Sequence, residues 1–200
     1  MSVVGRVHAN VVFGRRVRVL ALALNEIIPR GGDLVDVGCG DGSVARALSE
    51  QRPDLEIRGF ETLVRPDSHI PVAAFDGVTV PLPDDAADFV MLVDVLHHTD
   101  DPAQLLAEAA RVARRAVILK DHDVRGMLAR PTLRFMDWVG NAHHNVALPY
   151  NYWTPEQWSE AFERLGLVVA ERHDRMPLYP FPVSVVFGRK LHFVTRLERS

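Results

Sequence analysis

Short apolar runs alternate along the chain with longer segments of helical periodicity. The runs that predict strands are Leu34–Val37, Leu55–Phe60, Val72–Phe75, Phe89–Val93, Ala116–Leu119, Leu167–Glu171 and Leu191–Leu197. The segments that predict helices are residues 13–28, Ser43–Gln51, Pro102–Arg115 and Pro155–Leu165. Strands that alternate with helices predict βαβ units, and therefore an α/β fold whose parallel sheet is covered on both faces.

Two of the predicted helices carry clear start signals. Asp100 or Asp101 can cap the helix that has Pro102 at its first position, and arginines fill its last turn. Thr154 and Gln157 have the spacing of a capping box. These signals predict that helices begin near residues 102 and 155.

A glycine-rich segment, Asp36–Ser43, follows the first predicted strand and opens a helix. Glycines permit a tight turn and let a ligand lie against the backbone. A dinucleotide fingerprint would need glycine in place of Ser43, and a P-loop would need Gly-Lys-Ser/Thr after the loop. The segment therefore matches neither of these two phosphate-binding patterns.

With this loop, the chain resembles the class I S-adenosylmethionine-dependent methyltransferases, especially their small bacterial members. The family pattern D/E-x-G-x-G-x-G, which cradles the methionine part of the cofactor, is matched by Asp36, Gly38, Gly40 and Gly42. Cys39 is expected to be a small filler within this cofactor-binding loop. The resemblance implies a Rossmann-like doubly wound sheet of about seven strands, mostly parallel with an antiparallel last strand.

The resemblance continues over roughly residues 30–120 and implies further cofactor contacts. Glu61, at the end of the second predicted strand, would accept both ribose hydroxyls. The tripeptide Phe75, Asp76 and Gly77 resembles the family's adenine site. The stretch 81–98 resembles the family's strand beside the transferable methyl group, and it adds Asp94 and Val95 to the expected cofactor site.

One connection departs from the family pattern. Only residues 62–74, which include Pro66 and Pro71, separate Glu61 from Phe75. This segment is too short and too broken for the usual helix plus strand. We predict that the helix is missing or reduced to a turn, so that the N-terminal segment covers the adenosine side or leaves it open.

The segment 121–154 is long for a connection within a compact domain, and such segments are usually functional. It is rich in aromatic, histidine and asparagine residues, and residues 131–140 could form a short helix. Aromatic walls with a few polar groups are typical of a small-molecule pocket. We expect a substrate-facing cover here, the alternative being a loop whose aromatic side chains only pack in the core.

A base is needed only where the methyl acceptor carries a proton, and histidine titrates nearest to neutrality. His97 and His98 follow the strand that should pass the methyl group. Neighbouring residues on an extended chain point in opposite directions, so we expect only one of them, His98, to face the cofactor. The candidate catalytic residues are His98, His122, His144 and Tyr152.

No metal site is expected, because the chain lacks a His-Glu-x-x-His motif and a second cysteine. A metal would require histidines from three separate segments to converge with a carboxylate. Those residues are His97 or His98, His122, His143 or His144, and Asp121 or Asp123.

Composition narrows the class of protein. With 23 Lys+Arg against 26 Asp+Glu, the net charge of −3 argues against broad nucleic-acid binding. The single cysteine, Cys39, excludes an internal disulfide framework. No apolar run approaches the roughly 20 residues of a membrane span, and the N-terminus lacks a signal-peptide pattern. We therefore expect a cytoplasmic protein with no membrane partner.

Residues 1–200 are expected to form one methyltransferase domain. Its parts are an N-terminal helix or cover (1–30), a cofactor-binding core (31–120), the substrate-facing cover (121–154) and a C-terminal helix with strands (155–200). The predicted activity is methyl transfer from S-adenosyl-L-methionine to an oxygen, nitrogen or carbon atom of a small molecule, by a monomer or a homodimer. The alternatives are an RNA or protein methyltransferase and a non-catalytic protein that binds the cofactor.

Overall fold

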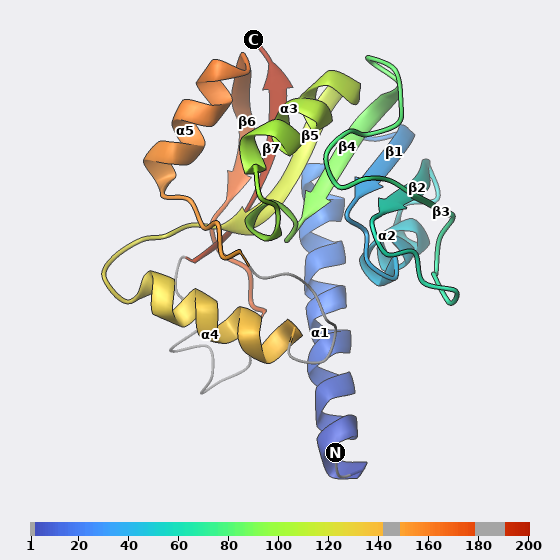
Figure 1. The fold of residues 1–200 in the computed structure, drawn as a ribbon. Helices are drawn as coiled ribbons and strands as arrows, with labels where there is room; N and C mark the ends of the chain where they lie inside the picture. Colours follow the sequence, from blue (N-terminus) through green and yellow to red (C-terminus); the bar gives the residue numbers. More distant parts are fainter. Residues whose placement is uncertain (1–2, 142–148, 179–190) are drawn as a thin grey trace.

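The computed structural model describes residues 3–141, 149–178 and 191–200. The strands are β1 (Gly32–Val37), β2 (Leu55–Glu61), β3 (Val72–Ala74), β4 (Ala87–Val93), β5 (Ala113–His122), β6 (Leu167–His173) and β7 (His192–Arg199). The helices are α1 (Val3–Ile27), α2 (Ser43–Gln51), the 3₁₀ helix η1 (Leu96–His98), α3 (Pro102–Val112), α4 (Ala129–Asn141) and α5 (Pro155–Arg164). The chain alternates strands and helices as its sequence predicts (Figure 1).

The seven strands form one sheet in the order β3-β2-β1-β4-β5-β7-β6. Strands β3, β2, β1, β4 and β5 run parallel, and β7 runs antiparallel to both of its neighbours. This is the mostly parallel sheet with an antiparallel last strand that the family resemblance implies. The strand order reverses between β1 and β4, so the ends of these two strands lie where open α/β sheets bind ligands.

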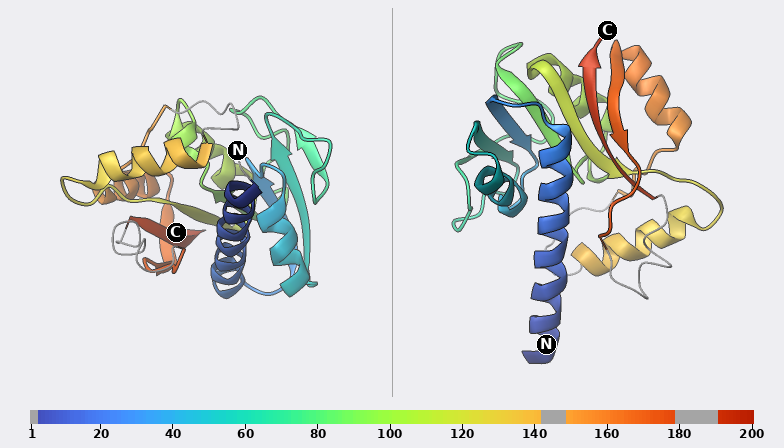
Figure 2. Two further views of the ribbon diagram at one scale, coloured as in Figure 1. Left: turned by 90° about the horizontal axis from the view of Figure 1, so that it is seen from below. Right: turned by 180° about the vertical axis from the view of Figure 1, so that it is seen from behind.

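Helices cover both faces of the sheet (Figure 2). On one face, α1 and α2 pack through Leu20, Leu24 and Leu48 against the strands. On the other, Leu106 of α3 and Trp158 of α5 belong to a second apolar cluster with the opposite side chains of the sheet. The central strands β1, β4 and β5 are therefore buried on both sides over most of their length, which explains their runs of apolar residues.

The connection between β2 and β3 contains turns and no helix, as its shortness predicts. It stays close to the glycine loop, because the backbone N–H of His69 donates to the carbonyl of Asp41 over 2.8 Å. The carbonyl of Pro71 accepts from Gly59 on β2, also over 2.8 Å. The shortened connection thus becomes part of the wall beside the glycine loop.

Two predicted helix boundaries are wrong. The helix expected over 13–28 begins at Val3, and Phe13 is exposed because only the later part of α1 packs on the sheet. The helix expected to reach Arg115 ends at Val112, and the strand expected over 116–119 begins at Ala113. Pairing of β5 with β4, together with ion pairs from Arg114, outweighs the helix propensity of these arginines.

Helix α4 and the N-terminal half of α1 lie on the side of the sheet where β4 and β5 end (Figure 1). Helix α4 overlaps the helix predicted over 131–140, and its Leu133 is buried against Tyr152 and Leu191. Both helices thus stand near the edge that a ligand would approach. Among the described residues, no helix is both long and apolar enough to cross a membrane.

Candidate active site

The glycine loop turns sharply between β1 and α2. Gly38, Gly40 and Gly42 all have left-handed backbone conformations, with φ of 73°, 60° and 76°. A side chain at Gly38 would overlap Val95, and one at Gly42 would overlap Ile70. A side chain at Gly40 would meet no atom within 4 Å. Gly38 and Gly42 are therefore required by packing, while Gly40 leaves its face of the loop open.

Two carboxylates line this loop. Glu61 ends β2, and its Oε2 accepts the backbone N–H of Gly40 over 2.7 Å, while its Oε1 accepts that of Thr62 over 2.8 Å. Asp36 is buried at the end of β1. Burial, and then the Glu61 carboxylate, raise the pKa of Asp36 to about 7. The charge of the Glu61 carboxylate would stabilise a cation bound beside it, and such a cation would in turn favour the ionised form of Asp36.

Cys39 fills space in the loop rather than offering a nucleophile. Its side chain packs against Gly59, where an added Cβ would meet the sulfur atom. Burial, and then Asp36 and Glu61, raise the pKa of the Cys39 thiol. The thiol therefore stays protonated, and the thiolate that a reactive cysteine needs does not form.

The expected adenine residues lie beyond β3. The backbone N–H of Phe75 donates to the carbonyl of Glu61 over 3.2 Å, so the two expected cofactor segments are in contact. Asp76 is exposed, and its Oδ1 accepts the backbone N–H groups of Val78 and Thr79 over 2.8 and 2.7 Å. These bonds hold the carboxylate in a fixed turn that includes Gly77, which has a φ of 85°.

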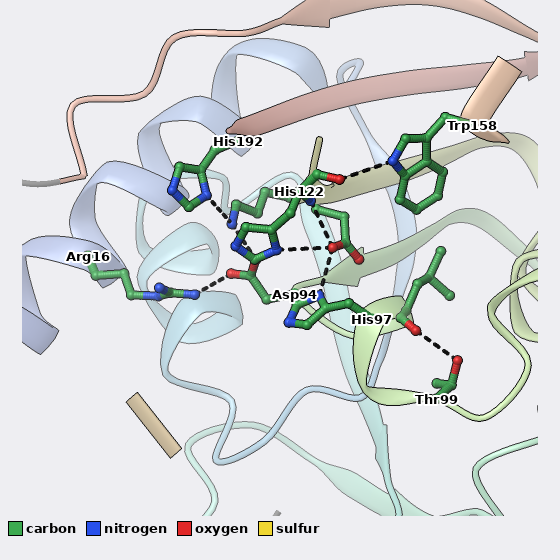
Figure 3. Close-up of polar contacts among 10 residues, drawn as sticks. Arg16, Asp94, His97, Thr99, His122, Trp158 and His192 are labelled. Atoms are coloured by element: carbon green, nitrogen blue, oxygen red, sulfur yellow. Dashed lines mark hydrogen bonds and ion pairs between the residues drawn. The ribbon is translucent and has the colours of Figure 1, made fainter. Parts of the chain in front are cut away.

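Charged and imidazole side chains gather where β4, β5 and β7 meet the ligand-binding edge (Figure 3). We call this group the polar cluster; it comprises Arg16, Asp94, His97, Lys120, Asp121, His122 and His192. Its residues come from α1, η1, the strands β5 and β7, and the position directly after β4, so the cluster forms only when the sheet and α1 come together. Most of its side chains are buried.

Asp94 is the centre of the cluster. It follows β4 in a left-handed conformation, with a φ of 58°. Its Oδ1 accepts from Lys120 and its Oδ2 from Arg16. Burial raises the pKa of Asp94, but the Lys120 and Arg16 charges hold it well below its ordinary value. Asp94 is therefore ionised, and it ties α1 to the ends of β4 and β5.

A second carboxylate, Asp121, orients two imidazoles. Its Oδ1 accepts from Nδ1 of His97 at 2.7 Å, from Nδ1 of His122 at 3.2 Å and from the backbone N–H of His122 at 2.8 Å. Burial, and then Lys120 and His97, lower the pKa of His122. Burial and Lys120 likewise lower the pKa of His192, whose Nδ1 lies 3.5 Å from Nζ of Lys120. Both imidazoles are thus neutral near pH 7.

The arrangement of His97 and His98 differs from the expected one. They lie on η1, not on an extended chain, and their ring centroids are 4.0 Å apart. The premise that they point in opposite directions is therefore wrong. His97 is the buried partner of Asp121, whereas His98 is partly exposed.

Tyr152 is buried, and its ring stacks on that of His97 with centroids 5.4 Å apart. His122 belongs to the polar cluster and lies 5.8 Å from Tyr152, centroid to centroid. His144 lies outside the described residues. The structure thus brings together His98, His122 and Tyr152 of the four candidate catalytic residues.

Sequence reasoning missed several members of the polar cluster as site residues. Lys120 carries the one available signal, a charge directly after the apolar run Ala116–Leu119, where a buried cation needs a partner. Arg16 and His192 carry no comparable local signal. They lie at opposite ends of the sequence and meet only in the folded sheet.

Comparison with known proteins decides the family. A methyltransferase domain model matches residues 12–172 of the chain. The chain belongs to the methyltransferase domain family. The matched range contains the glycine loop and most of the polar cluster.

A curated relative of the chain is the bifunctional methionine biosynthesis protein MetXA/MetW of Rhodopirellula baltica. The two are 31% identical over 123 aligned residues, which cover 50% of this chain and 20% of the relative. The match thus spans only about a fifth of that protein's length.

Solved structures show the same class I fold. An S-adenosylmethionine-dependent methyltransferase from Thermotoga maritima matches with a TM-score of 0.67 and 19% identity, covering 95% of this chain and 92% of that one. Another, from Mesorhizobium loti, matches with a TM-score of 0.64 and 17% identity, covering 88% and 96%. At these identities the likeness concerns the fold.

Proposed function

We propose that this methyltransferase binds S-adenosyl-L-methionine at the glycine loop and transfers its methyl group to a small-molecule acceptor. The observation that carries the proposal is the open face of Gly40, bordered by the Glu61 carboxylate. A ligand with hydroxyl donors and a positive charge suits this site, because both Glu61 and the nearby Asp36 are acidic.

The residues that would hold the cofactor lie at the ends of three neighbouring strands, β1, β2 and β3. The backbone of Gly38–Gly42 would lie against the methionine part, with Asp36 supplying negative charge. Glu61 already accepts four donors, from Gly40, Thr62 and Leu63. Because a carboxylate has about four acceptor positions, the ribose hydroxyls would take the place of some of these donors. Phe75 and Asp76 would border the adenine.

The bound cofactor supplies an activated methyl group on a sulfonium leaving group. The protein then has to align the acceptor, exclude water and, where the acceptor carries a proton, remove it. The ends of β4 and β5 carry the groups suited to this work. His122 is a candidate base there, because it is neutral near pH 7 and is oriented by Asp121.

Calorimetry with S-adenosylmethionine and S-adenosylhomocysteine tests the cofactor assignment directly. Gly40→Ala should abolish or greatly weaken binding, because a methyl group would enter the open face of the loop. Gly31→Ala is the matched control, since Gly31 also has a positive φ of 69° and no atom within 4 Å, but lies at the opposite end of β1. The control should bind like wild type. Absence of binding to the wild-type protein at millimolar ligand would refute the proposal.

The acceptor class needs a separate experiment. Helix α4 and the N-terminal half of α1 stand beside the strand ends, which favours a small acceptor over a large one. With methyl-labelled cofactor and a cell extract separated into small-molecule, RNA and protein fractions, we expect labelled product in the small-molecule fraction. Labelled RNA or protein alone would instead support the macromolecular alternative.

A further inference from the structure

We propose that Asp94, His97 and His122 form a binding site for a divalent transition-metal ion such as Zn²⁺. Each residue offers one ligand atom, and the three atoms lie within 4.8 Å of one another. A bound zinc would lie about 2.0–2.2 Å from each ligand atom, so the site needs only a small closing movement. The sequence offers little reason to expect these three residues to converge, because they come from the position after β4, from η1 and from β5.

The residue types fit a transition metal better than Ca²⁺ or Mg²⁺. Two imidazoles and one carboxylate are ligands that Zn²⁺ prefers, whereas the harder cations take oxygen atoms. Three protein ligands also leave a fourth position open, which is the arrangement of catalytic rather than structural zinc sites. His192 lies beside the proposed ligands, with its ring centroid 4.7 Å from that of His122.

Asp121 supplies an independent indication of a metal site. Its Oδ1 contacts Nδ1 of both His97 and His122, at 2.7 and 3.2 Å. A carboxylate that accepts from one ring nitrogen fixes the tautomer and leaves the lone pair on the other. Ligand histidines in metal sites are usually held in this way. The orienting bonds here are already in place, and both rings are buried.

The main obstacle to metal binding is that two cationic side chains already contact Asp94. Lys120 occupies Oδ1 of Asp94 and Arg16 occupies Oδ2, so a metal ion has to displace the ammonium group of Lys120. Two features offset this cost. Asp121 adds a second negative charge to the cluster, and Arg16, about a third exposed, keeps part of its hydration. Lys120 therefore competes with the metal for the same carboxylate oxygen.

Such an ion would stand at the edge where β4 and β5 end. If the proposed methyl transfer is correct, its open position could take an oxygen atom of the acceptor, and a metal-bound hydroxyl loses its proton more readily. With the metal bound, His122 would act as a ligand and not as the base. Only this role rests on the proposed function. Metal binding itself is measured without cofactor or acceptor, so failure of one proposal is distinguishable from failure of the other.

The test is titration of the metal-free protein (residues 1–200) with Co²⁺, a spectroscopic substitute for Zn²⁺, followed by competition with Zn²⁺. We expect one ion per chain, with visible absorption typical of four-coordinate Co²⁺ that Zn²⁺ abolishes. Asp94→Asn, His97→Gln and His122→Gln should each weaken binding about tenfold or more, and Asp121→Asn should weaken it about 10–100-fold. His69→Gln, a change to an exposed histidine outside the cluster, is the control and should bind like wild type.

Lys120→Met gives a test in the opposite direction. Removing the competing ammonium should tighten Co²⁺ binding, a gain that a misfolded variant could not produce. No binding to the wild-type protein would overturn the proposal, even if Lys120→Met bound the ion, because the natural site would then be filled by its own lysine. Binding that the three ligand substitutions leave unchanged would also overturn it.

Discussion

Asp36 is a residue whose charge depends on its surroundings. The motif places a carboxyl group at the end of β1, where burial and the Glu61 carboxylate raise its pKa from 3.8 to about 7. An isolated buried carboxylate is unfavourable, so the folded protein retains a proton on Asp36 that the unfolded chain gives up. The residue therefore costs stability at neutral pH while making the loop attractive to a cation.

This cost has a definite pH dependence. Below pH 3.8, Asp36 is protonated in both the folded and the unfolded chain, so it costs no stability. As the pH rises to about 7, the unfolded chain loses this proton first, and the free energy of unfolding falls. Between pH 5 and pH 8, wild type should lose about 3 kcal/mol more unfolding free energy than Asp36→Asn. Urea denaturation at the two pH values measures this difference. Asp67→Asn, at an exposed position in the β2–β3 connection, should follow wild type, and parallel profiles of Asp36→Asn and wild type would contradict the prediction.

Some site residues could be predicted from the sequence and others could not. The glycine loop could be predicted because its residues are contiguous, and the spacing itself describes the turn. Glu61 could be predicted because it ends a recognisable strand. The polar cluster could not, because Arg16, Lys120 and His192 come from distant segments. Their contacts depend on the sheet order and on where α1 crosses it, which no local pattern encodes.

Among the elements, helix starts were easier to predict than helix ends. Asp101 caps α3 by accepting the N–H of Gln104 over 3.0 Å, and Thr154 forms the predicted capping box with Gln157. Both depend on side chains within a few residues of the cap. The end of α3 depends instead on pairing between β4 and β5, so the sequence alone placed it three residues too late.

The capping box of α5 should contribute measurably to stability. Thr154→Ala removes the acceptor for the N–H of Gln157 and should lower the unfolding free energy by about 1 kcal/mol. Ser159→Ala, an exposed change within the same helix, is the control and should alter it by less than about 0.5 kcal/mol. Equal effects of the two substitutions in urea denaturation would show that the cap is not stabilising.

At the scale of the whole molecule, the two apolar clusters extend across the sheet from the glycine loop to the C-terminal strands. One cluster contains Val37 beside the loop together with Phe193 of β7 and Trp158 of α5. The cofactor-binding strands and the C-terminal helix therefore share one core. Segments that share a core are expected to unfold together.

The chain should accordingly unfold in a single cooperative transition. Tryptophan fluorescence includes Trp153 and Trp158 near α5, whereas far-ultraviolet circular dichroism reports on the whole chain, and the two transitions should coincide.

S-adenosylhomocysteine at about 100 times its Kd should raise the unfolding free energy by about 2.7 kcal/mol in both signals, because it binds only the folded state. Gly40→Ala should unfold in one transition that the ligand does not shift. A fluorescence transition that the ligand leaves unmoved while the dichroism shifts would show that α5 and the cofactor-binding strands belong to separate units, despite their common core.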